Sequence, residues 1–170
     1  IAHPELVVTP GSRIAIRGPN GAGKTTLFNR LIDACHLEFS GAIVVPQEID
    51  EKTATALLEH LRSLPSDQAG ETLSHVARLG SRPERLLETP FLSPGEARKL
   101  MLSFGLSRGV RLIAMDEPTN HLDVTSIRCV EQAIEAVSKT GVIVSDDDGV
   151  GRATAGIGSE FDLVDARIGL

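Results

Sequence analysis

Aromatic residues and cysteines are scarce in this 170-residue chain. It has no Trp or Tyr and only five Phe, so a stacking platform for nucleic-acid bases is not expected. The two cysteines, Cys35 and Cys129, are far apart and neither belongs to a C-x-x-C pair. That pattern predicts no disulfide framework and no cysteine metal site, and it favours a reducing, cytoplasmic compartment.

Long apolar runs and a surplus of basic residues are also missing. The longest apolar runs, 42–45 and 112–115, have four residues each, whereas a membrane-spanning helix needs roughly 18. We therefore expect no transmembrane segment. With 17 Lys and Arg against 23 Asp and Glu, the net charge is −6, which argues against a direct nucleic-acid patch or binding to anionic membranes. The chain opens on Ile1 without a leader pattern, so we expect no signal peptide and a piece of a longer protein.

The remaining composition is that of a single globular domain. Hydrophobic residues make up 41% of the chain and glycines number 16, which is ordinary for a domain with one core. Apolar strand patterns alternate with helical ones, and this alternation predicts an α/β fold with a parallel central sheet. We expect one domain over 1–170, with a small helical subdomain inserted at about 50–108. The expected strands are 12–17, 42–45, 110–115, 141–145 and, in the tail, 161–168.

Local signals mark the expected helices. One follows residue 24, and the insertion holds helices near 57–64, 73–79 and 93–108. Gly80 is the predicted stop of the helix near 73–79, and Ser81 is the predicted cap of a short extra helical turn. An apolar stripe predicts a last helix, which Asp123 would cap. The stripe consists of Val124, Ile127, Val130, Ile134 and Val137.

A phosphate-binding loop is the most specific motif. Gly18-Pro-Asn20-Gly21-Ala22-Gly23-Lys24-Thr25 fits G-x-x-x-x-G-K-[ST] and lies between an expected strand and an expected helix. Its backbone N–H groups and the helix N-terminus would cradle phosphates. Lys24 suits the β- and γ-phosphates, and the Thr25 hydroxyl suits Mg²⁺. We assign the neighbouring Thr26 to the same nucleotide site, and the loop predicts a layered P-loop NTPase fold.

Two carboxylates are expected at the end of a strand, near the phosphate loop. Asp116 and Glu117 directly follow the apolar run 112–115, and the carboxyl ends of parallel strands face the ligand crevice. Asp116 is placed to hold Mg²⁺, and Glu117 to orient or deprotonate the attacking water. Gln47, just past another strand, could bring its amide oxygen to Mg²⁺ or to that water. Alone, it would be read as an exposed loop residue.

The segment Leu92-Ser93-Pro94-Gly95-Glu96 has two compatible interpretations. Ser93 and Glu96, with Pro94 at the first helical position, form an ordinary capping box. A capped helix N-terminus is also an anion site when its mouth stays exposed. The residues alone do not decide between these roles.

The order of these motifs along the chain resembles that of an ATP-binding cassette (ABC) nucleotide-binding domain. The phosphate loop, Gln47, the Ser-Pro-Gly-Glu segment and Asp116-Glu-Pro-Thr-Asn-His-Leu-Asp123 follow one another over about 12–145. The resemblance implies a signature loop in which Ser93, Gly95 and Glu96 cap ATP held by a second cassette. It also implies that Asp123 belongs to a D-loop at the same head-to-tail interface.

Asn120-His121 and the Ser-Pro-Gly-Glu form of the signature look most like the F subfamily. Members of that group are soluble tandem cassettes that act on ribosomes in translation or antibiotic resistance. The resemblance thus implies ATP and Mg²⁺ as cofactors, and a ribosome contacted through parts of the protein outside this chain.

Three departures from the family pattern bear on activity. Asp146 stands where the family has a switch histidine, and a second anion near the γ-phosphate would cost roughly 4 kcal/mol at about 4 Å and an effective dielectric of about 20. We therefore expect reduced hydrolysis, unless Mg²⁺ or movement offsets this charge; if Asp146 points away, the site is simply weaker. No aromatic residue precedes Gly18 to stack on adenine, and Lys24 and Gln47 are only 23 positions apart, which indicates a reduced β subdomain.

Two alternatives to a ribosome-associated ATPase stay open. One is the ATPase subunit of a membrane transporter, which would need a coupling surface after Gln47. The other is a degenerate cassette that binds ATP without useful turnover, as Asp146 suggests.

Overall fold

Strands and helices alternate along the chain, as the sequence pattern predicts. The computed structural model describes residues 11–17, 21–38, 41–118, 122–136, 141–146 and 159–162. Among them no helix is long and apolar enough to cross a membrane. The elements in chain order are β1 (Arg13–Arg17), α1 (Lys24–Glu38), β2 (Ala42–Val45), α2 (Glu51–Ser63), α3 (Ser66–Arg78), α4 (Pro83–Glu88), α5 (Pro94–Ser107), β3 (Leu112–Asp116), α6 (Val124–Ala136), β4 (Gly141–Asp146) and β5 (Ser159–Asp162).

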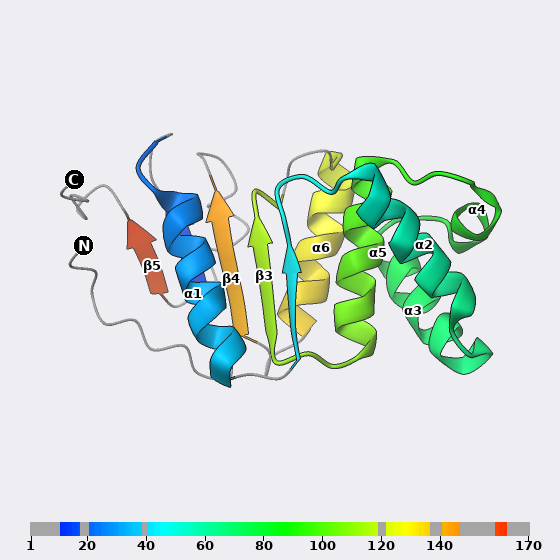
Figure 1. Cartoon of the computed structure of the whole chain (residues 1–170), viewed down its shortest axis with the longest axis horizontal. Helices are drawn as coiled ribbons and strands as arrows, with labels where there is room; N and C mark the ends of the chain where they lie inside the picture. The colour runs from blue at the N-terminus through cyan, green and yellow to red at the C-terminus, as the bar shows by residue number, and fades with distance from the viewer. Residues whose placement is uncertain are drawn as a thin grey trace.

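The described strands form one sheet in the order β2-β3-β4-β1-β5. All of their pairings are parallel, so their carboxyl ends lie at one edge, the upper edge in Figure 1. β4 lies between β1 and β3, with Ser145 level with Asp116 and Asp146 level with Arg17. The sheet order thus places the ends of β1, β4, β3 and β2 next to one another.

Apolar side chains cover both faces of the sheet. On one face, α1 buries Phe28 and Ile32 against Ile14 and Ile16 of β1. On the other, α5 and α6 contribute Leu102 and Val130, which pack with Val45, Ile113 and Met115 of β2 and β3. Figure 1 shows α1 in front of the sheet, α6 behind it and α5 beside β2. The result is the layered α/β fold that the phosphate loop predicts.

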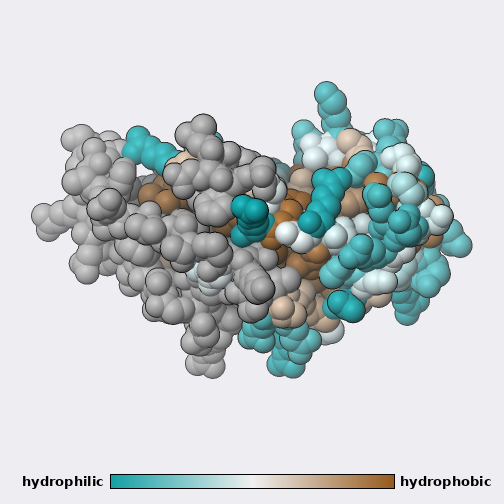
Figure 2. All heavy atoms as spheres, turned by 90° about the horizontal axis from the view of Figure 1, so that it is seen from below, coloured by the Kyte–Doolittle hydropathy of each residue, from teal (hydrophilic) through white to brown (hydrophobic). Residues whose placement is uncertain are grey.

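Helices α2, α3 and α4 pack beside α5, beyond the β2 edge of the sheet (Figure 1). Their shared core is a separate cluster, composed of Leu61, Val76, Leu86, Leu100 and Phe104. Figure 2, seen from the side opposite the carboxyl ends of the strands, shows mostly hydrophilic surface over this helical end, with hydrophobic side chains in the strip beside it. Because α5 belongs to both cores, it ties the helices to the sheet.

The structure corrects several details of the expected strands. β2 was expected to be buried, but only Val45 is, because β2 is the edge strand of the described sheet. β3 begins at Leu112 instead of residue 110, because the Val110 N–H bonds the Gly105 carbonyl at the end of α5. β5 covers Ser159–Asp162, so the expected tail strand starts too late, and its residues 163–168 lie outside the described part.

Helix signals were mostly confirmed, with two exceptions. Gly80 has φ 77° and follows the end of α3, as expected of a helix stop. Ser81 does not cap α4: its N–H closes α3 on the Val76 carbonyl, and the N-cap is Arg82 with Pro83 after it. Val124 is 69% exposed and does not join the apolar stripe of α6, because it is the first residue of the helix, while Val130 is buried in the middle.

Candidate functional site

The phosphate loop has the backbone of an anion-binding turn where the structure describes it. Gly21 and Gly23 have φ of 83° and 92°, a region that side-chain-bearing residues rarely adopt. The Gly23 carbonyl accepts the Leu27 N–H at 2.9 Å, which starts α1 immediately after the loop. A Cβ at Gly21 would meet no atom within 4 Å, so there is room beside this backbone. Gly18 and Asn20 lie outside the described residues.

The start of α1 suits a polyanion. Its first turn contains no acidic residue, so no carboxylate of that turn opposes the attraction of the helix dipole for an anion. Lys24 is only 7% exposed, so most of its side chain is shielded from bulk solvent. The side chains of Thr25 and Thr26 are exposed at the same helix end, and Ala22 is half-buried.

The two predicted carboxylates end β3. Asp116 is the last residue of the strand and is 6% exposed. Glu117 follows with φ 47°, the one positive φ of a non-glycine residue in the described segments. A left-handed residue costs about 1–2 kcal/mol, so neighbouring contacts must hold it.

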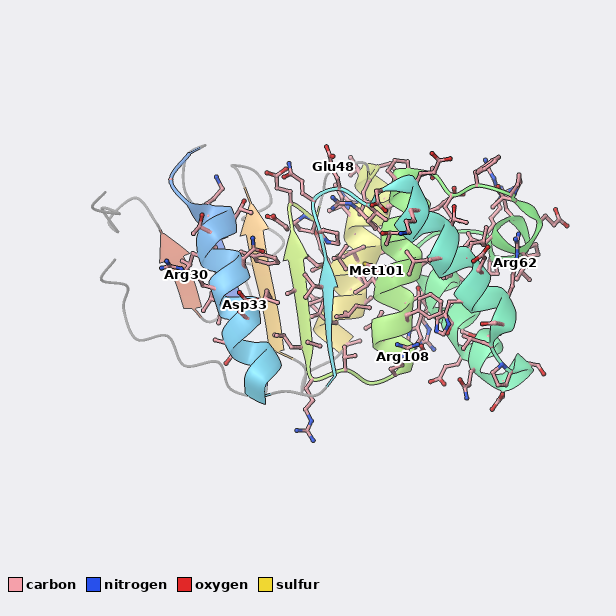
Figure 3. The ribbon with its side chains drawn as sticks, viewed as in Figure 1. Arg30, Asp33, Glu48, Arg62, Met101 and Arg108 are labelled. Atoms are coloured by element: carbon pink, nitrogen blue, oxygen red, sulfur yellow. The ribbon has the colours of Figure 1, made fainter. Side chains whose placement is uncertain are left out.

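Gln47 and Glu117 are in direct contact across the carboxyl edge of the sheet. The Gln47 amide nitrogen donates to the Glu117 carboxylate, Nε2 to Oε2, at 2.8 Å. The pair forms because β2 and β3 are adjacent and parallel, with Val45 level with Met115. Figure 3 shows Glu48, the next residue after Gln47, at this edge. The structure thus brings together two residues that are 70 positions apart.

The oxygen donors near this edge suit Mg²⁺. Thr25, Gln47 and Asp116 offer a hydroxyl, an amide oxygen and one carboxylate; Thr25 lies in the first turn of α1, Gln47 follows β2, and Asp116 ends the adjacent β3. Mg²⁺ usually binds proteins through one or two carboxylates, together with water and substrate phosphates. No trio of His, Cys, Asp or Glu able to hold a metal occurs in the described segments, so an ion here would also depend on phosphate oxygens. When bound, Mg²⁺ neutralises charge on the transferring phosphate.

The expected capping box at α5 is present. Ser93 donates through N and Oγ to Glu96 Oε2, at 2.9 and 2.7 Å, and the Glu96 N–H returns to Ser93 Oγ at 3.3 Å. Partial burial acts to raise the pKa of Glu96, but the hydrogen bonds from Ser93 and the charges of Arg85 and Lys99 outweigh it and hold the pKa below 4.5. Ser93 is exposed and Gly95 half-buried, so the mouth of this helix is open.

Asp123 is the N-cap of α6, as predicted. The Ser126 N–H donates to its Oδ1 at 2.7 Å, and hydrogen bonds from Ser126 hold the pKa of Asp123 below its ordinary value of 3.8. Asp146 ends β4, between the ends of β1 and β3, and its side chain lies outside what the structure describes.

One residue of this edge was missed by the sequence interpretation. Arg98, in the second turn of α5, is 4% exposed and donates to the carbonyl oxygens of Glu117 and Gln47. A signal existed, because Arg98 lies four residues before the buried Leu102 and so on the same helix face. A charge on a buried face requires a partner.

Comparison with known proteins shows the family of the chain. The family model described as ABC transporter matches residues 2–120. The tylosin resistance ATP-binding protein TlrC of Streptomyces fradiae is 32% identical over 154 residues, covering 85% of this chain and 28% of that protein. The ribosome protection protein VmlR of Bacillus subtilis is 32% identical over 145 residues, covering 85% of this chain and 25% of that protein.

A transporter relative and two solved structures show similar cassettes. The zinc import ATP-binding protein ZnuC of Pseudomonas entomophila is 30% identical over 133 residues, covering 71% of this chain and 51% of that protein. The structure of an ATP-binding subunit of an ABC transporter superimposes with a TM-score of 0.70 at 23% identity, covering 92% of this chain and 76% of that one. A dimeric ATP-binding cassette with bound ADP and Pi gives a TM-score of 0.65 at 18% identity, covering 87% and 80%.

This chain spans about a quarter of the length of the tylosin resistance and ribosome protection proteins that it matches. The family match covers well over half of the chain, and the solved cassettes share its fold. The chain therefore belongs to the ABC transporter family and is an ATP-binding cassette.

Proposed function

We propose that this cassette binds Mg-ATP and hydrolyses it. The observation that carries the proposal is the hydrogen bond between Gln47 and Glu117 at the carboxyl edge of the sheet. It holds the expected general base beside the expected water- or metal-binding amide. The phosphate loop opens from the same edge, at the end of β1.

Phosphate binding falls to the loop and to α1. The left-handed Gly21 and Gly23 orient backbone N–H groups, and the N-terminus of α1 adds a favourable dipole. Lys24 supplies a point charge for the β- and γ-phosphates. Thr25, Gln47 and Asp116 would hold Mg²⁺.

Water activation falls to Glu117. A carboxylate that accepts a proton from water as the water attacks the γ-phosphorus acts as a general base. Gln47 donates its amide N–H to that carboxylate, which fixes the orientation of the carboxylate. The Gln47 amide oxygen remains an acceptor for the attacking water or for Mg²⁺.

At the level of the whole protein, we propose an F-type cassette that acts on the ribosome in translation or antibiotic resistance. Relatives named for tylosin resistance and ribosome protection support this role. A second cassette would complete the site, because the exposed α5 mouth with Ser93 and Gly95 would cap ATP held by the partner, and Asp123 would lie at the same interface. A cytoplasmic location follows from this role.

A specific observation favours transporter coupling as a second candidate. A hollow of about 260 Å³ lies between the start of α2 and the loop before α5, lined by Ile49, Ala54, Leu58 and Phe91 among others. Phe91 is 68% exposed, and the hollow lies just after Gln47, where a transporter subunit would need its coupling surface. Co-sedimentation of the full-length protein with ribosomes supports the F-type role, whereas co-purification with a membrane permease supports the transporter role.

The test of hydrolysis is the variant Glu117→Gln. The amide keeps the size of the side chain but cannot take a proton, so turnover should fall by about 10²–10⁴-fold while ATP affinity stays unchanged. Phosphate release measures turnover, and titration calorimetry measures affinity. Unchanged turnover would show that Glu117 is not the general base. If the wild type binds Mg-ATP but does not hydrolyse it, the chain is instead a degenerate cassette that binds ATP without useful turnover.

A further inference from the structure

The buried guanidinium of Arg98 lies between the two loops that carry Gln47 and Glu117 at the carboxyl edge of the sheet. Its Nη1 donates to the Glu117 carbonyl at 2.8 Å, and its Nη2 donates to the Gln47 carbonyl. One side chain of α5 therefore joins the loop after β2 to the loop after β3. The planar fork of arginine allows both contacts at once, which a lysine ammonium on a flexible stem does not reproduce.

One of these contacts falls on strained backbone. Glu117 has φ 47°, a conformation that costs about 1–3 kcal/mol unless surrounding contacts hold it. Arg98 binds the carbonyl of that same residue. The contact thus stabilises the peptide unit that directs the Glu117 carboxylate toward Gln47.

Charge also ties Arg98 to this edge. Burial lowers the pKa of Arg98 below its ordinary value, while the carboxylates of Glu117 and Asp116 act in the opposite direction. A guanidinium stays charged at neutral pH even so. Losing it would remove one positive charge from the surroundings of the largely buried Asp116.

Arg98 lies one helical turn after Pro94, the first residue of α5. The same rigid helix therefore carries the exposed Ser93 cap at its start and the guanidinium that holds Glu117 and Gln47. Under the proposed function, the Ser93 cap and the residues held by Arg98 serve two different ATP molecules. Ser93 and Gly95 would face ATP of the partner cassette, whereas Glu117 serves ATP bound to its own phosphate loop.

We propose that Arg98 is a positioning residue that holds Glu117 and Gln47 in their productive geometry and links them rigidly to the signature end of α5. This inference rests on the proposed ATP hydrolysis. Its consequence is a selective loss: without Arg98, ATP binds as before, but Glu117 no longer holds its place for water activation.

The test compares Arg98→Gln and Arg98→Lys with Arg62→Gln as a matched control. Arg62 also donates to two backbone carbonyls, those of Leu87 and Thr89 at 3.2 and 2.7 Å, but it lies on the helical side away from the sheet (Figure 3). Arg98→Gln should lower kcat about ten- to a hundredfold, as expected for a displaced catalytic group, with KM for ATP nearly unchanged. Arg98→Lys should restore part of the lost kcat, and Arg62→Gln should leave kcat unchanged.

Hydrogen exchange of the nucleotide-free protein gives a readout independent of turnover. In Arg98→Gln the amides of residues 47–49 and 116–117 should both exchange faster, while Arg62→Gln leaves them as in the wild type. If Arg98→Gln does not fold, kcat and hydrogen exchange of Arg98→Lys are compared with those of the wild type and Arg62→Gln instead. A kcat equal to that of the wild type, or unchanged exchange in both segments, overturns the role of Arg98. Absence of wild-type turnover overturns the proposed hydrolysis instead, and the exchange result still decides whether Arg98 positions the two loops.

Discussion

At the residue scale, the carboxylate at position 146 is the sharpest departure from the family pattern. Asp146 ends β4, whose neighbours β1 and β3 lead into the phosphate loop and Glu117. A negative charge there would repel the γ-phosphate, whereas a histidine would donate a hydrogen bond to it. We predict that Asp146→His raises either ATPase activity or ATP-dependent dimerisation in the presence of Mg²⁺.

Both quantities can be followed in one series of measurements. Phosphate release reports turnover, and light scattering reports the dimer, with Glu117→Gln as the slow-turnover background. We expect a monomer without nucleotide and at most a weak head-to-tail dimer with ATP. If Asp146→His changes neither quantity, Asp146 does not face the γ-phosphate.

The residues of the candidate site differ in how far sequence alone could predict their contacts. The spacing of the phosphate loop and the end of the apolar run at Asp116 and Glu117 are local signals, so their positions at element ends could be read directly. The Gln47–Glu117 bond joins distant segments, and the sequence did not predict it, because it assigned each residue only to Mg²⁺ or to the attacking water. The place of Arg98 on the buried face of α5 could have been read from the sequence, but its partners could not, because they are backbone carbonyls.

At the element scale, the approach of α5 to β2 depends on Gly105. A Cβ at this position would lie 2.6 Å from Cγ2 of Ile43, a β-branched side chain with little freedom to move. Alanine improves intrinsic helix propensity by about 1 kcal/mol, but overpacking of this kind costs about 1–3 kcal/mol. We predict that Gly105→Ala lowers the free energy of unfolding, measured by urea titration.

Gly70 in α3 is the matched control, because a Cβ there would meet nothing within 4 Å. Gly70→Ala should raise stability by about 0.5–1 kcal/mol. Equal gains for both variants would show that α5 does not pack this closely on β2.

The capping box of α5 makes part of the stability pH-dependent. Because the pKa of Glu96 is lowered in the folded state, its contribution is present above the ordinary carboxyl pKa and is lost as pH falls through the lowered value. Glu96→Gln can still accept hydrogen bonds but has no charge at the helix N-terminus. We predict a cost of about 0.3–1 kcal/mol at pH 7.

Thermal unfolding between pH 7 and pH 3 measures this effect. The Tm difference between wild type and Glu96→Gln should shrink below about pH 4.5, the ordinary value for this group. A difference that stays constant over the whole range would exclude the ionised capping box as its source.

Element types followed from the sequence better than element environments. The continuous apolar run of β2 was read as a buried strand, but the run does not encode that β2 lies at the sheet edge. Val124 fits the helical period of α6 and is nevertheless exposed, because periodicity does not show how far a helix extends past its partner. Both errors concern tertiary position, which local patterns do not specify.

At the scale of the whole molecule, the order of the strands decides what meets at the site. Alternating strands and helices predicted a parallel sheet, but not the order β2-β3-β4-β1-β5. This order places the end of β4 between the ends of β1 and β3, and β2 beside β3, so residues from distant segments converge at one edge. The chain also spans only about a quarter of the length of its resistance and ribosome-protection relatives.

The central claim, that the phosphate loop binds Mg-ATP through Lys24, is tested most directly by titration calorimetry. Mg-ATP is titrated into the variant Glu117→Gln and into the double variant Lys24→Ala/Glu117→Gln. Both carry Glu117→Gln, so that heat from ATP hydrolysis does not disturb the measured heat of binding. Thermal unfolding without nucleotide first shows that both variants are folded. Losing the charge-assisted contact of Lys24 should cost about 1.5–3 kcal/mol, more than about a tenfold increase in Kd. Equal affinity of the two variants would contradict the assignment of the phosphate loop.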